Sequence, residues 1–502
     1  MTTLPGSPPA AGAGTGVDTM DLLRFATIGS VDDGKSTLIG RLLYDTRQLF
    51  DDQVAAIETA SERRGLGEVD LSFVTDGLRA EREQGITIDV AYRYAATPHR
   101  KFVIADCPGH VQYTRNMATG ASTADLALVL VDAASGLQEQ SRRHICIAAL
   151  LGVDQLVVCA NKMDLVEWDR SAYQRIADEM GALARRLGVA SCIVIPISAL
   201  HGDNVVDRSD AARWYDGPTV LDALESAQAG GWATQQGVHN GSGGRLPVQW
   251  VLRQPGGGRS YAGMVNGGPL QVGDRVVVLP QGATTTVRAV ETADGPLQRA
   301  EVGRSVSLRL ADHLDVSRGD LIAAAEEPPA VTDSFEATAC WFGTQPLNSG
   351  HRLRLKHTTR VTPVMVEQVS GTFDVNELRV TEATELREND IGVVRLRTAT
   401  RLAIDPYDAD RITGSFVLID EQSFATVAAG MVGPPRLHDE LDGRYSVLLS
   451  RLPRRHRTVL SGRGRRPGRR AQGPGPGRLR RSGHGRRDLP QPGNGSPRAS
   501  AP

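Results

Sequence analysis

Short apolar runs alternate with amphipathic segments over the first half of the chain, from residue 21 to about residue 225. The apolar runs have the length and flanking turn residues of buried strands, and the segments after them repeat apolar residues at helical spacing. The predicted strands are residues 24–29, 101–107, 125–133, 155–161 and 192–198, and the predicted helices are residues 35–45, 139–152 and 168–188. This alternation predicts a doubly wound, mainly parallel α/β sheet with ligand-binding loops at the strand ends.

The pattern changes in the second half of the chain, after a glycine-rich segment. Apolar residues there alternate with polar ones around Gly-Asp turns, as in residues 270–280 and 316–324. Such alternation predicts the hairpins of two small β-barrels. The expected organisation is a disordered extension (1–20), an α/β domain (21–228), a linker (229–244), two β-barrel domains (245–330 and 331–432) and a disordered tail (433–502).

Composition places the chain among soluble globular proteins, because 40% of its 502 residues are hydrophobic and 23% are charged. No stretch approaches the roughly 18 consecutive apolar residues of a membrane span. The N-terminal segment lacks the basic flank and apolar block of a signal peptide, so we expect a cytoplasmic protein without a membrane partner. The five cysteines are scattered and lie mostly in apolar runs, which favours reduced, buried thiols over disulfides or a zinc site.

Charge is distributed unevenly along the chain. Residues 451–502 hold 15 arginines, no lysine and one acidic residue, so the remainder of the chain is acidic although the net charge is only -1. The tail has almost no apolar residues and no interleaved aromatic residues for base stacking. A solvated extension or a reading-frame artefact is therefore favoured over an RNA-binding arm, and a nucleic-acid partner is not expected.

A phosphate-binding loop follows the first predicted strand. The pattern GxxxxGKS is complete in GSVDDGKST, where backbone N–H groups curl around phosphates, a lysine supplies a cation and a serine supplies a hydroxyl for Mg2+. The candidate nucleotide-binding residues here are Gly29, Ser30, Val31, Asp32, Asp33, Gly34, Lys35, Ser36 and Thr37. Two adjacent carboxylates are unexpected in a loop that binds a polyanion.

Three further residues are candidates for contacting the γ-phosphate or the metal ion. Asp106 ends a predicted strand in the motif DCPGH, where it can hold Mg2+ through water. The N–H of Gly109 can meet a γ-phosphate and move when that group leaves. Thr87, in EREQGITID, lies in a polar segment that can close over the metal, so Ser36, Thr87 and Asp106 are the predicted Mg2+ residues.

The motif NKMD, at the end of another predicted strand, indicates guanine selection. The carboxylate of Asp164 can accept two hydrogen bonds from guanine, whereas adenine offers no such pair of donors. Asn161 is expected to brace the loop and Lys162 to lie along the base. Ser198, Ala199 and Leu200 are expected to complete the pocket with a backbone N–H to the guanine carbonyl. Together these motifs predict GTP binding.

Lysine usage supports these assignments. The chain contains four lysines, Lys35, Lys101, Lys162 and Lys356, among 57 basic residues. Two of the four fall in nucleotide motifs, where a compact ammonium is not interchangeable with a planar guanidinium.

The segments GSVDDGKSTLIGRLLYDTRQLFDDQ, EREQGITIDVAYRY, DCPGHVQYTRNMATGASTADLALVLVDAASGLQEQSRRH and NKMDLVEW resemble the elongation-factor class of GTPases. More narrowly, they are similar to the GTPase (large) subunits of heterodimeric bacterial sulfate adenylyltransferase, over about residues 22–432. The resemblance implies a P-loop GTPase domain followed by two barrels like elongation-factor domains 2 and 3. It also implies a separate small catalytic subunit that joins ATP and sulfate into adenylyl sulfate and diphosphate, driven by GTP hydrolysis on the large subunit.

The resemblance also implies roles for individual residues. An aspartate at the position of Asp32 commonly helps hold a monovalent cation such as K+ beside the phosphates, which would neutralise its charge. Asp33 is expected to face solvent or an arginine. His110 matches the histidine that orients the attacking water, so the catalytic residues are expected to be His110, Lys35 and Thr87.

Two alternatives accompany this hypothesis. An elongation-factor-type GTPase that binds aminoacyl-tRNA has the same architecture, but YDTRQLFDDQ and HVQYTRNMATGAS match the sulfate-activating branch better. Some members of this branch continue into an adenylyl-sulfate kinase, which requires a second GxxxxGKS loop. None follows residue 432, so kinase activity is not expected, and the tail as a frame-shifted remnant of such a domain stays open.

Overall fold

The computed structural model describes residues 21–49, 71, 87–229, 243–253 and 258–435. The predicted N-terminal extension, nearly all of the predicted linker and the arginine-rich part of the tail lie outside these residues. Among the described residues, no helix is long and apolar enough to cross a membrane. All five cysteines are free thiols, and four of them are buried.

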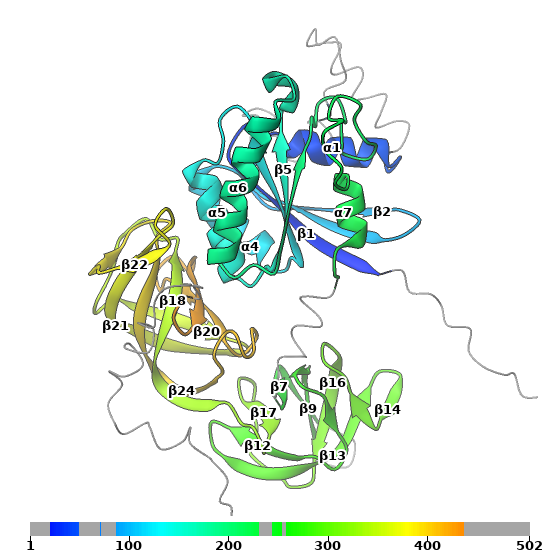
Figure 1. Cartoon of the computed structure of the whole chain (residues 1–502). Helices are drawn as coiled ribbons and strands as arrows, with labels where there is room; N and C mark the ends of the chain where they lie inside the picture. Colours follow the sequence, from blue (N-terminus) through cyan, green and yellow to red (C-terminus); the bar gives the residue numbers. More distant parts are fainter. Residues whose placement is uncertain (1–20, 50–70, 72–86, 230–242, 254–257, 436–502) are drawn as a thin grey trace, which may run out of the picture. The chain divides into compact units, whose positions relative to one another are not determined.

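The first part of the chain is a six-stranded sheet with helices on both faces (Figure 1). The strand order is β2-β3-β1-β4-β5-β6, and every neighbouring pair is parallel except β2 with β3. The strands are β1 (Leu22–Ile28), β2 (Ala91–Ala96), β3 (Lys101–Asp106), β4 (Leu126–Asp132), β5 (Gln155–Asn161) and β6 (Ser191–Pro196). This is the doubly wound, mainly parallel sheet that the sequence predicts.

The helices divide between two hydrophobic cores, one on each face of the sheet. They are α1 (Lys35–Asp45), α4 (Thr114–Ala121), α5 (Glu139–Leu150), α6 (Arg170–Arg186) and α7 (Val220–Ser226), with the short 3-10 turns η2 (Val111–Tyr113) and η3 (Met163–Val166). Helices α4, α5 and α6 pack in one core, and α1 and α7 pack in the other. Strand β1 contributes Leu23 and Phe25 to the α1 side and Ala26 and Ile28 to the α4 side, because successive side chains of a strand point to opposite faces.

Strand β2 is the element of this sheet that the hydrophobic pattern does not reveal. Its sequence AYRYAA alternates half-buried and exposed residues, and Tyr94 is 77% exposed. An antiparallel strand at a sheet edge needs no continuous apolar run, because only one of its faces packs against the core. The strand begins at Ala91, shortly after Thr87 in the chain, and pairs with β3 along its whole length.

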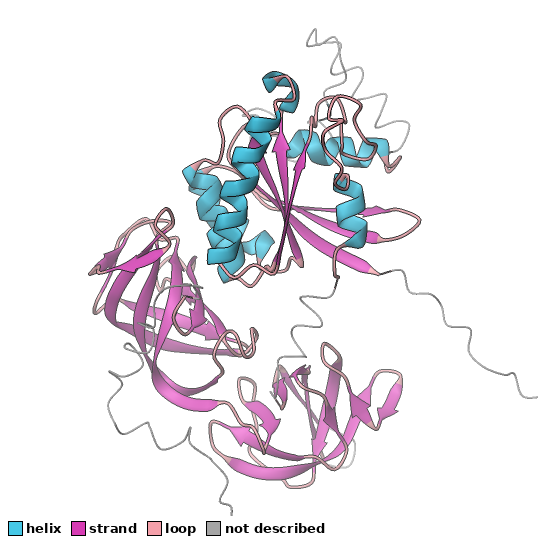
Figure 2. Cartoon of the chain, in the orientation of Figure 1, coloured by secondary structure: helices cyan, strands magenta, loops and turns pink. Residues whose placement is uncertain are grey.

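The remainder of the described chain is almost entirely β-structure (Figure 2). The first barrel comprises β7 (Gly244–Pro247), β8 (Trp250–Arg253), β9 (Arg259–Met264), β10 (Asn266–Gly267), β11 (Leu270–Gln271), β12 (Arg275–Leu279), β13 (Ala283–Thr292), β14 (Gly295–Leu297), β15 (Arg299–Ala300), β16 (Ser305–Leu310) and β17 (Leu321–Ala324). Its main sheet runs β10-β7-β17-β12-β13-β16-β9-β8. Because β10 continues β9 along the chain and pairs with β7, the sheet closes on itself.

The second barrel closes by a direct strand pair. Its elements are β18 (Ala330–Trp341), β19 (Leu347–Asn348), β20 (Arg352–His357), β21 (Arg360–Asp374), β22 (Arg379–Thr381), β23 (Glu385–Leu386), β24 (Ile391–Ile404), β25 (Ser415–Ile419) and β26 (Thr426–Val432). The sheet runs β20-β25-β26-β18-β24-β21-β22, and β20 also pairs with β21. Each barrel encloses its own apolar core, and the burial of these apolar side chains stabilises it.

Candidate functional site

The predicted nucleotide residues meet at the carboxyl edge of the parallel sheet. The phosphate loop (residues 29–36) joins the end of β1 to the start of α1. Asp106 ends β3, Asn161 ends β5 and Ser198 follows β6. Loops at the carboxyl ends of neighbouring parallel strands form a common crevice, which is where ligands bind in sheets of this kind. Ser36 and Thr37 are half-buried in the first turn of α1, and Val31 is 40% exposed at the outside of the loop.

Asn161 joins the phosphate loop to the two loops that are predicted to bind the base, residues 161–164 and 198–200 (the base loops). Its side-chain amide donates to the Asp33 carbonyl at 2.8 Å, and its Oδ1 accepts the Ala199 N–H at 2.9 Å. Gly34 lies against it with φ +92°, and a Cβ at this glycine would overlap the Asn161 side chain. These two bonds agree with the bracing role expected of Asn161, which stays a prediction. Because the Ala199 N–H is engaged, the neighbouring N–H of Leu200 is the better candidate for the guanine carbonyl.

Lys35 is almost fully buried at the centre of the loop. Its Nζ donates to the carbonyl of Ser30 at 2.7 Å and to that of Gly29 at 3.3 Å. An ammonium has three N–H donors, so one remains for a phosphate oxygen. Burial lowers the pKa of Lys35, and the nearby charges of Asp33 and Asp106 oppose that shift.

Asp33 does not lie where the sequence analysis expects it. It is only 4% exposed, and no arginine among the described residues forms an ion pair with it. Its Oδ2 accepts the Ser30 N–H at 2.6 Å and the Ser141 hydroxyl of α5 at 3.4 Å. The expectation that Asp33 faces solvent or an arginine is wrong, because these two donors hold the carboxylate against the inner side of the loop. Asp32, in contrast, is exposed, with φ +65°.

Asp106 is buried and oriented by a residue that sequence reasoning misses. Thr27, fully buried in β1, donates its hydroxyl to Asp106 Oδ1 at 3.2 Å and accepts the Cys107 N–H at 3.4 Å. A polar residue inside an otherwise apolar strand is the one signal in the sequence that could have identified it.

Gly109 lies directly against Lys35. A Cβ at this position would overlap the Lys35 ammonium and the Ser30 carbonyl. Only glycine therefore lets the backbone approach the phosphate loop this closely, and the sensing of a γ-phosphate by Gly109 stays a prediction. The sequence predicts that role from the motif, and the close approach supplies its physical reason.

His110 follows Gly109 and caps the short turn η2. Its Nδ1 accepts the Gln112 N–H at 3.3 Å, and its ring lies 6.0 Å from that of Tyr113. Because Nδ1 acts as an acceptor here, Nε2 is the nitrogen available to a ligand or water. The side chain is half-buried at the rim of the site.

Thr87 is half-buried, and the residue after it is held by the helix beyond His110. Asn116 of α4 donates its side-chain amide to the Ile88 carbonyl at 2.8 Å. This bond joins the end of the segment that carries Thr87 to the helix that begins after His110. Sequence reasoning does not identify Asn116, since nothing in its local pattern distinguishes it from other polar helix residues.

The base loops are held by charged side chains. Lys162, with φ +63°, places its Nζ 2.8 Å from Asp132 Oδ2. Burial raises the pKa of Asp132, but hydrogen bonds from Lys162 and from the N–H groups of Ala134 and Ser135 outweigh it and lower that pKa overall. Asp164, in η3, is partly exposed and has His201 Nε2 4.0 Å from its Oδ2.

Arg41 of α1 holds the second base loop, residues 198–200, by two hydrogen bonds. It donates to the Ala199 carbonyl at 3.3 Å and also to the Leu200 carbonyl. Helix α1 thus holds the phosphate loop at its first turn and the Ser198–Leu200 loop through Arg41. The helical periodicity predicts α1, but it does not distinguish this arginine from a solvated one.

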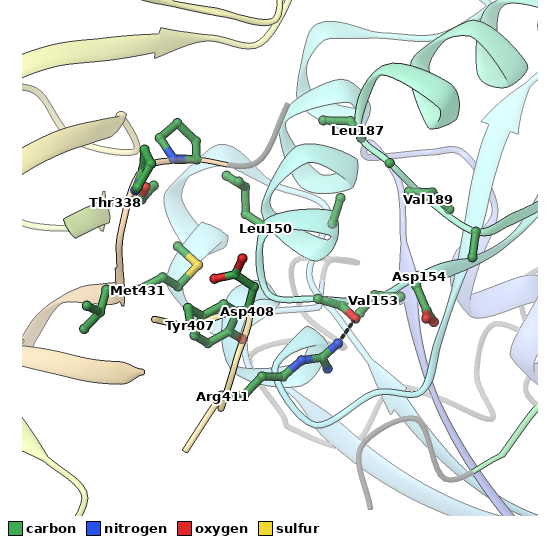
Figure 3. Close-up of a pocket in the computed structure, with 17 residues that line it drawn as sticks. Leu150, Val153, Asp154, Leu187, Val189, Thr338, Tyr407, Asp408, Arg411 and Met431 are labelled. Carbon is green, nitrogen blue, oxygen red and sulfur yellow. Dashed lines mark hydrogen bonds between the residues drawn. The ribbon is translucent and has the colours of Figure 1, made fainter. Parts of the chain in front are cut away.

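A cavity of about 250 Å3 lies away from these residues (Figure 3). It is lined by the ends of α5 and α6, the loops that follow them, and residues around Tyr407 and Met431 of the last barrel. Arg411 donates to the Gly152 carbonyl in its wall. None of the phosphate-loop or base-loop residues contributes to its lining, so it is not the nucleotide site.

Comparison with known proteins agrees with the geometry. Residues 20–229 match the family model of the elongation factor Tu GTP binding domain, and residues 334–433 match the GTP-eEF1A C-terminal domain-like model. The bifunctional enzyme CysN/CysC of Mycobacterium tuberculosis is 52% identical over 417 residues, covering 82% of this chain and 67% of that protein. Sulfate adenylyltransferase subunit 1 of Aeromonas hydrophila is 47% identical over 440 residues, covering 87% of this chain and 91% of that protein. The protein of the same name from Laribacter hongkongensis is 47% identical over 418 residues, covering 83% and 86% respectively.

Proposed function

Because the chain belongs to the sulfate adenylyltransferase subunit 1 family, we propose that it is the GTPase subunit of that enzyme. GTP hydrolysis on this chain would drive the conversion of ATP and sulfate to adenylyl sulfate and diphosphate on a partner catalytic subunit. The observation that best supports the GTPase role is the pair of bonds by which Asn161 joins the phosphate loop to the base loops. An elongation-factor role shares only the wider superfamily with this chain.

The described residues fit a magnesium nucleotide. Lys35 has a donor left for a phosphate oxygen, and the close approach of Gly109 shapes the space beside it. Ser36, Thr87 and Asp106 would hold Mg2+, because hydroxyl and carboxylate oxygens are the hard ligands it prefers. When bound, Mg2+ neutralises charge that develops on the transferring phosphoryl group. Thr27 orients Asp106, and His110 would position the attacking water through Nε2.

Guanine selection is proposed to rest on Asp164. The Asp164→Asn variant should bind GTP at least about tenfold more weakly, since one charge-assisted acceptor of two guanine donors is lost. It should gain affinity for xanthosine triphosphate, whose base carries a carbonyl where guanine carries the exocyclic amine. Equilibrium titration with both nucleotides checks this, and unchanged GTP affinity would refute the assignment.

Asp32 is proposed to hold a monovalent cation beside the phosphates. Its exposed carboxylate and left-handed backbone place it at the outer rim of the loop, on the side where a hydrated ion can reach it. GTP hydrolysis should then be faster in a potassium salt than in a tetramethylammonium salt at equal ionic strength. The Asp32→Ala variant should lose that difference, and equal rates for the unmodified protein in the two salts would exclude the cation.

The ligands of the partner subunit, the cellular location and the absence of a kinase activity are also proposals. We propose a cytoplasmic complex in which the partner subunit binds ATP and sulfate. The absence of adenylyl-sulfate kinase activity stays a prediction, because one matched relative is described as bifunctional and this chain covers 67% of it. An assay of adenylyl sulfate phosphorylation by the purified chain tests it directly.

Co-expression with a candidate small subunit tests the function as a whole. The two chains should co-purify, and adenylyl sulfate formation from ATP and sulfate should increase on addition of GTP. A non-hydrolysable GTP analogue is the control and should give no sustained increase. GTP-independent synthesis by the co-purified complex would contradict the proposal.

A further inference from the structure

The phosphate loop contains a buried negative charge on its inner side. Asp33 is 4% exposed, and its Oδ2 accepts the Ser30 N–H at 2.6 Å and the Ser141 hydroxyl at 3.4 Å. Ser141 is itself 1% exposed and bonds to the Ser30 hydroxyl at 2.9 Å. The carboxylate is therefore held in one place by donors from the loop itself and from α5.

This charge acts on the lysine that binds phosphate. Lys35 is buried, and its ammonium donates hydrogen bonds to the uncharged carbonyls of Gly29 and Ser30. The two groups meet at one residue, because Lys35 Nζ donates to the Ser30 carbonyl at 2.7 Å and Asp33 Oδ2 accepts the Ser30 N–H at 2.6 Å. Burial lowers the pKa of Lys35 and raises the pKa of Asp33, and the charge of each opposes the shift of the other. A buried ammonium without a counter-charge is costly, so Asp33 stabilises the loop when no phosphate is present.

The same charge has the opposite effect once a nucleotide is bound. GTP and GDP bring several negative charges to the loop, and they supply the counter-charge that Lys35 needs. Asp33 then faces charges of its own sign across a short, poorly screened distance. One fixed carboxylate thus stabilises the empty loop and destabilises the occupied one.

We propose that Asp33 is the built-in counter-ion of Lys35 in the nucleotide-free protein, and that it weakens guanine-nucleotide binding and speeds GDP release. The inference rests on the proposed GTPase function and concerns the affinity of that same site. It assigns the second carboxylate of the loop to nucleotide exchange, while the first, Asp32, faces outward.

The two possible roles of Asp33 predict different nucleotide affinities once its charge is removed, so they can be distinguished by experiment. Asparagine has the size of aspartate, and its carbonyl oxygen, placed where Asp33 Oδ2 lies, can still accept both the Ser30 N–H and the Ser141 hydroxyl. Asp33→Asn therefore keeps the shape of the loop and removes only the charge. If Asp33 served only to brace the loop, the variant would bind nucleotide equally well or more weakly.

The experiment measures release of fluorescently labelled GDP from the full-length protein by stopped-flow displacement, at fixed pH and potassium concentration. Asp33→Asn is expected to release GDP about tenfold more slowly than the unmodified protein, with a matching gain in affinity. The nucleotide-free variant should melt at a lower temperature, and added GDP should raise its melting temperature further than that of the unmodified protein. Asp33→Ser, which also removes the charge but leaves a short acceptor, should shift release in the same direction.

Asp125→Asn is the matched control. Asp125 is also a buried carboxylate that accepts a backbone N–H, that of Arg24 at 3.0 Å, but it precedes β4 at the opposite end of the sheet. Its neutral variant should release GDP within about twofold of the unmodified rate. Unchanged or faster release from Asp33→Asn and Asp33→Ser, or loss of folding in both, would overturn the proposal and make Asp33 a brace. Failure of the unmodified protein to bind labelled GDP would instead contradict the GTPase function.

Discussion

Replacing Lys35 with alanine is expected to weaken GTP binding roughly a hundredfold, since a charge-assisted contact to phosphate contributes about 1.5–3 kcal/mol in a buried site. The ammonium is buried between the Ser30 and Gly29 carbonyls, directly beside Gly109. No other lysine lies in this loop, and an arginine elsewhere cannot reach the same position with a single compact charge. The variant should therefore lose affinity for GTP and GDP alike.

Calorimetric titration of both nucleotides measures this loss. Lys101→Ala is the matched control, because Lys101 is an exposed lysine of the same domain at the start of β3. It should bind GTP as the unmodified protein does. The barrels have separate cores, so the circular dichroism of the Lys35→Ala variant should keep its β-sheet component. Normal GTP binding by Lys35→Ala would show that residues 29–36 are not the phosphate loop.

The parallel strands and their helices are the part of the fold that the sequence predicts best. Strand β5 and helix α1 have the bounds that periodicity gives them, because each is buried on a sheet face and its pattern is set by that burial. Strand β2 is missed because an edge strand with exposed tyrosines has no apolar run. The long strands β21 and β24 extend well beyond their apolar centres, since pairing with neighbours continues where side chains are exposed.

In the candidate site, the sequence predicts residues that belong to a local motif better than residues that act through tertiary contacts. Lys35, Asp106 and Asn161 are predictable because each belongs to a motif at a strand end. Arg41 and Asn116 are not, because each acts on a residue distant in sequence. Thr27, which acts on Asp106, has only one signal in the sequence, its polarity within an apolar strand. The burial of Asp33 depends on Ser141 of α5, more than a hundred residues away, which no local pattern could reveal.

The hydrolysis step is expected to depend most strongly on His110. Its Nδ1 caps η2 by accepting the Gln112 N–H, and we propose that Nε2 positions the attacking water. A positioned acid–base or water-orienting group contributes on the order of a hundredfold or more to the rate. Under the proposed function, hydrolysis has to wait for the partner subunit, because GTP would otherwise be consumed without product.

The isolated chain should therefore cleave GTP slowly, and the partner with ATP and sulfate should accelerate cleavage by ordering Thr87 and His110 about the γ-phosphate. His110→Ala should keep GTP affinity and partner binding but lose about a hundredfold of the accelerated rate, together with the GTP-driven gain in adenylyl sulfate. Single-turnover GTP cleavage with and without the partner measures the effect.

The capping bond of His110 requires a second variant, because alanine removes both the imidazole and the acceptor for the Gln112 N–H. Losing a cap costs about 1 kcal/mol of local stability and could by itself displace the turn η2. Asparagine is a good capping residue, so His110→Asn restores the acceptor without restoring the imidazole. If the imidazole positions water, both variants lose stimulated hydrolysis equally. If His110→Asn recovers the full rate, the histidine acts only by holding η2, and another residue positions the water.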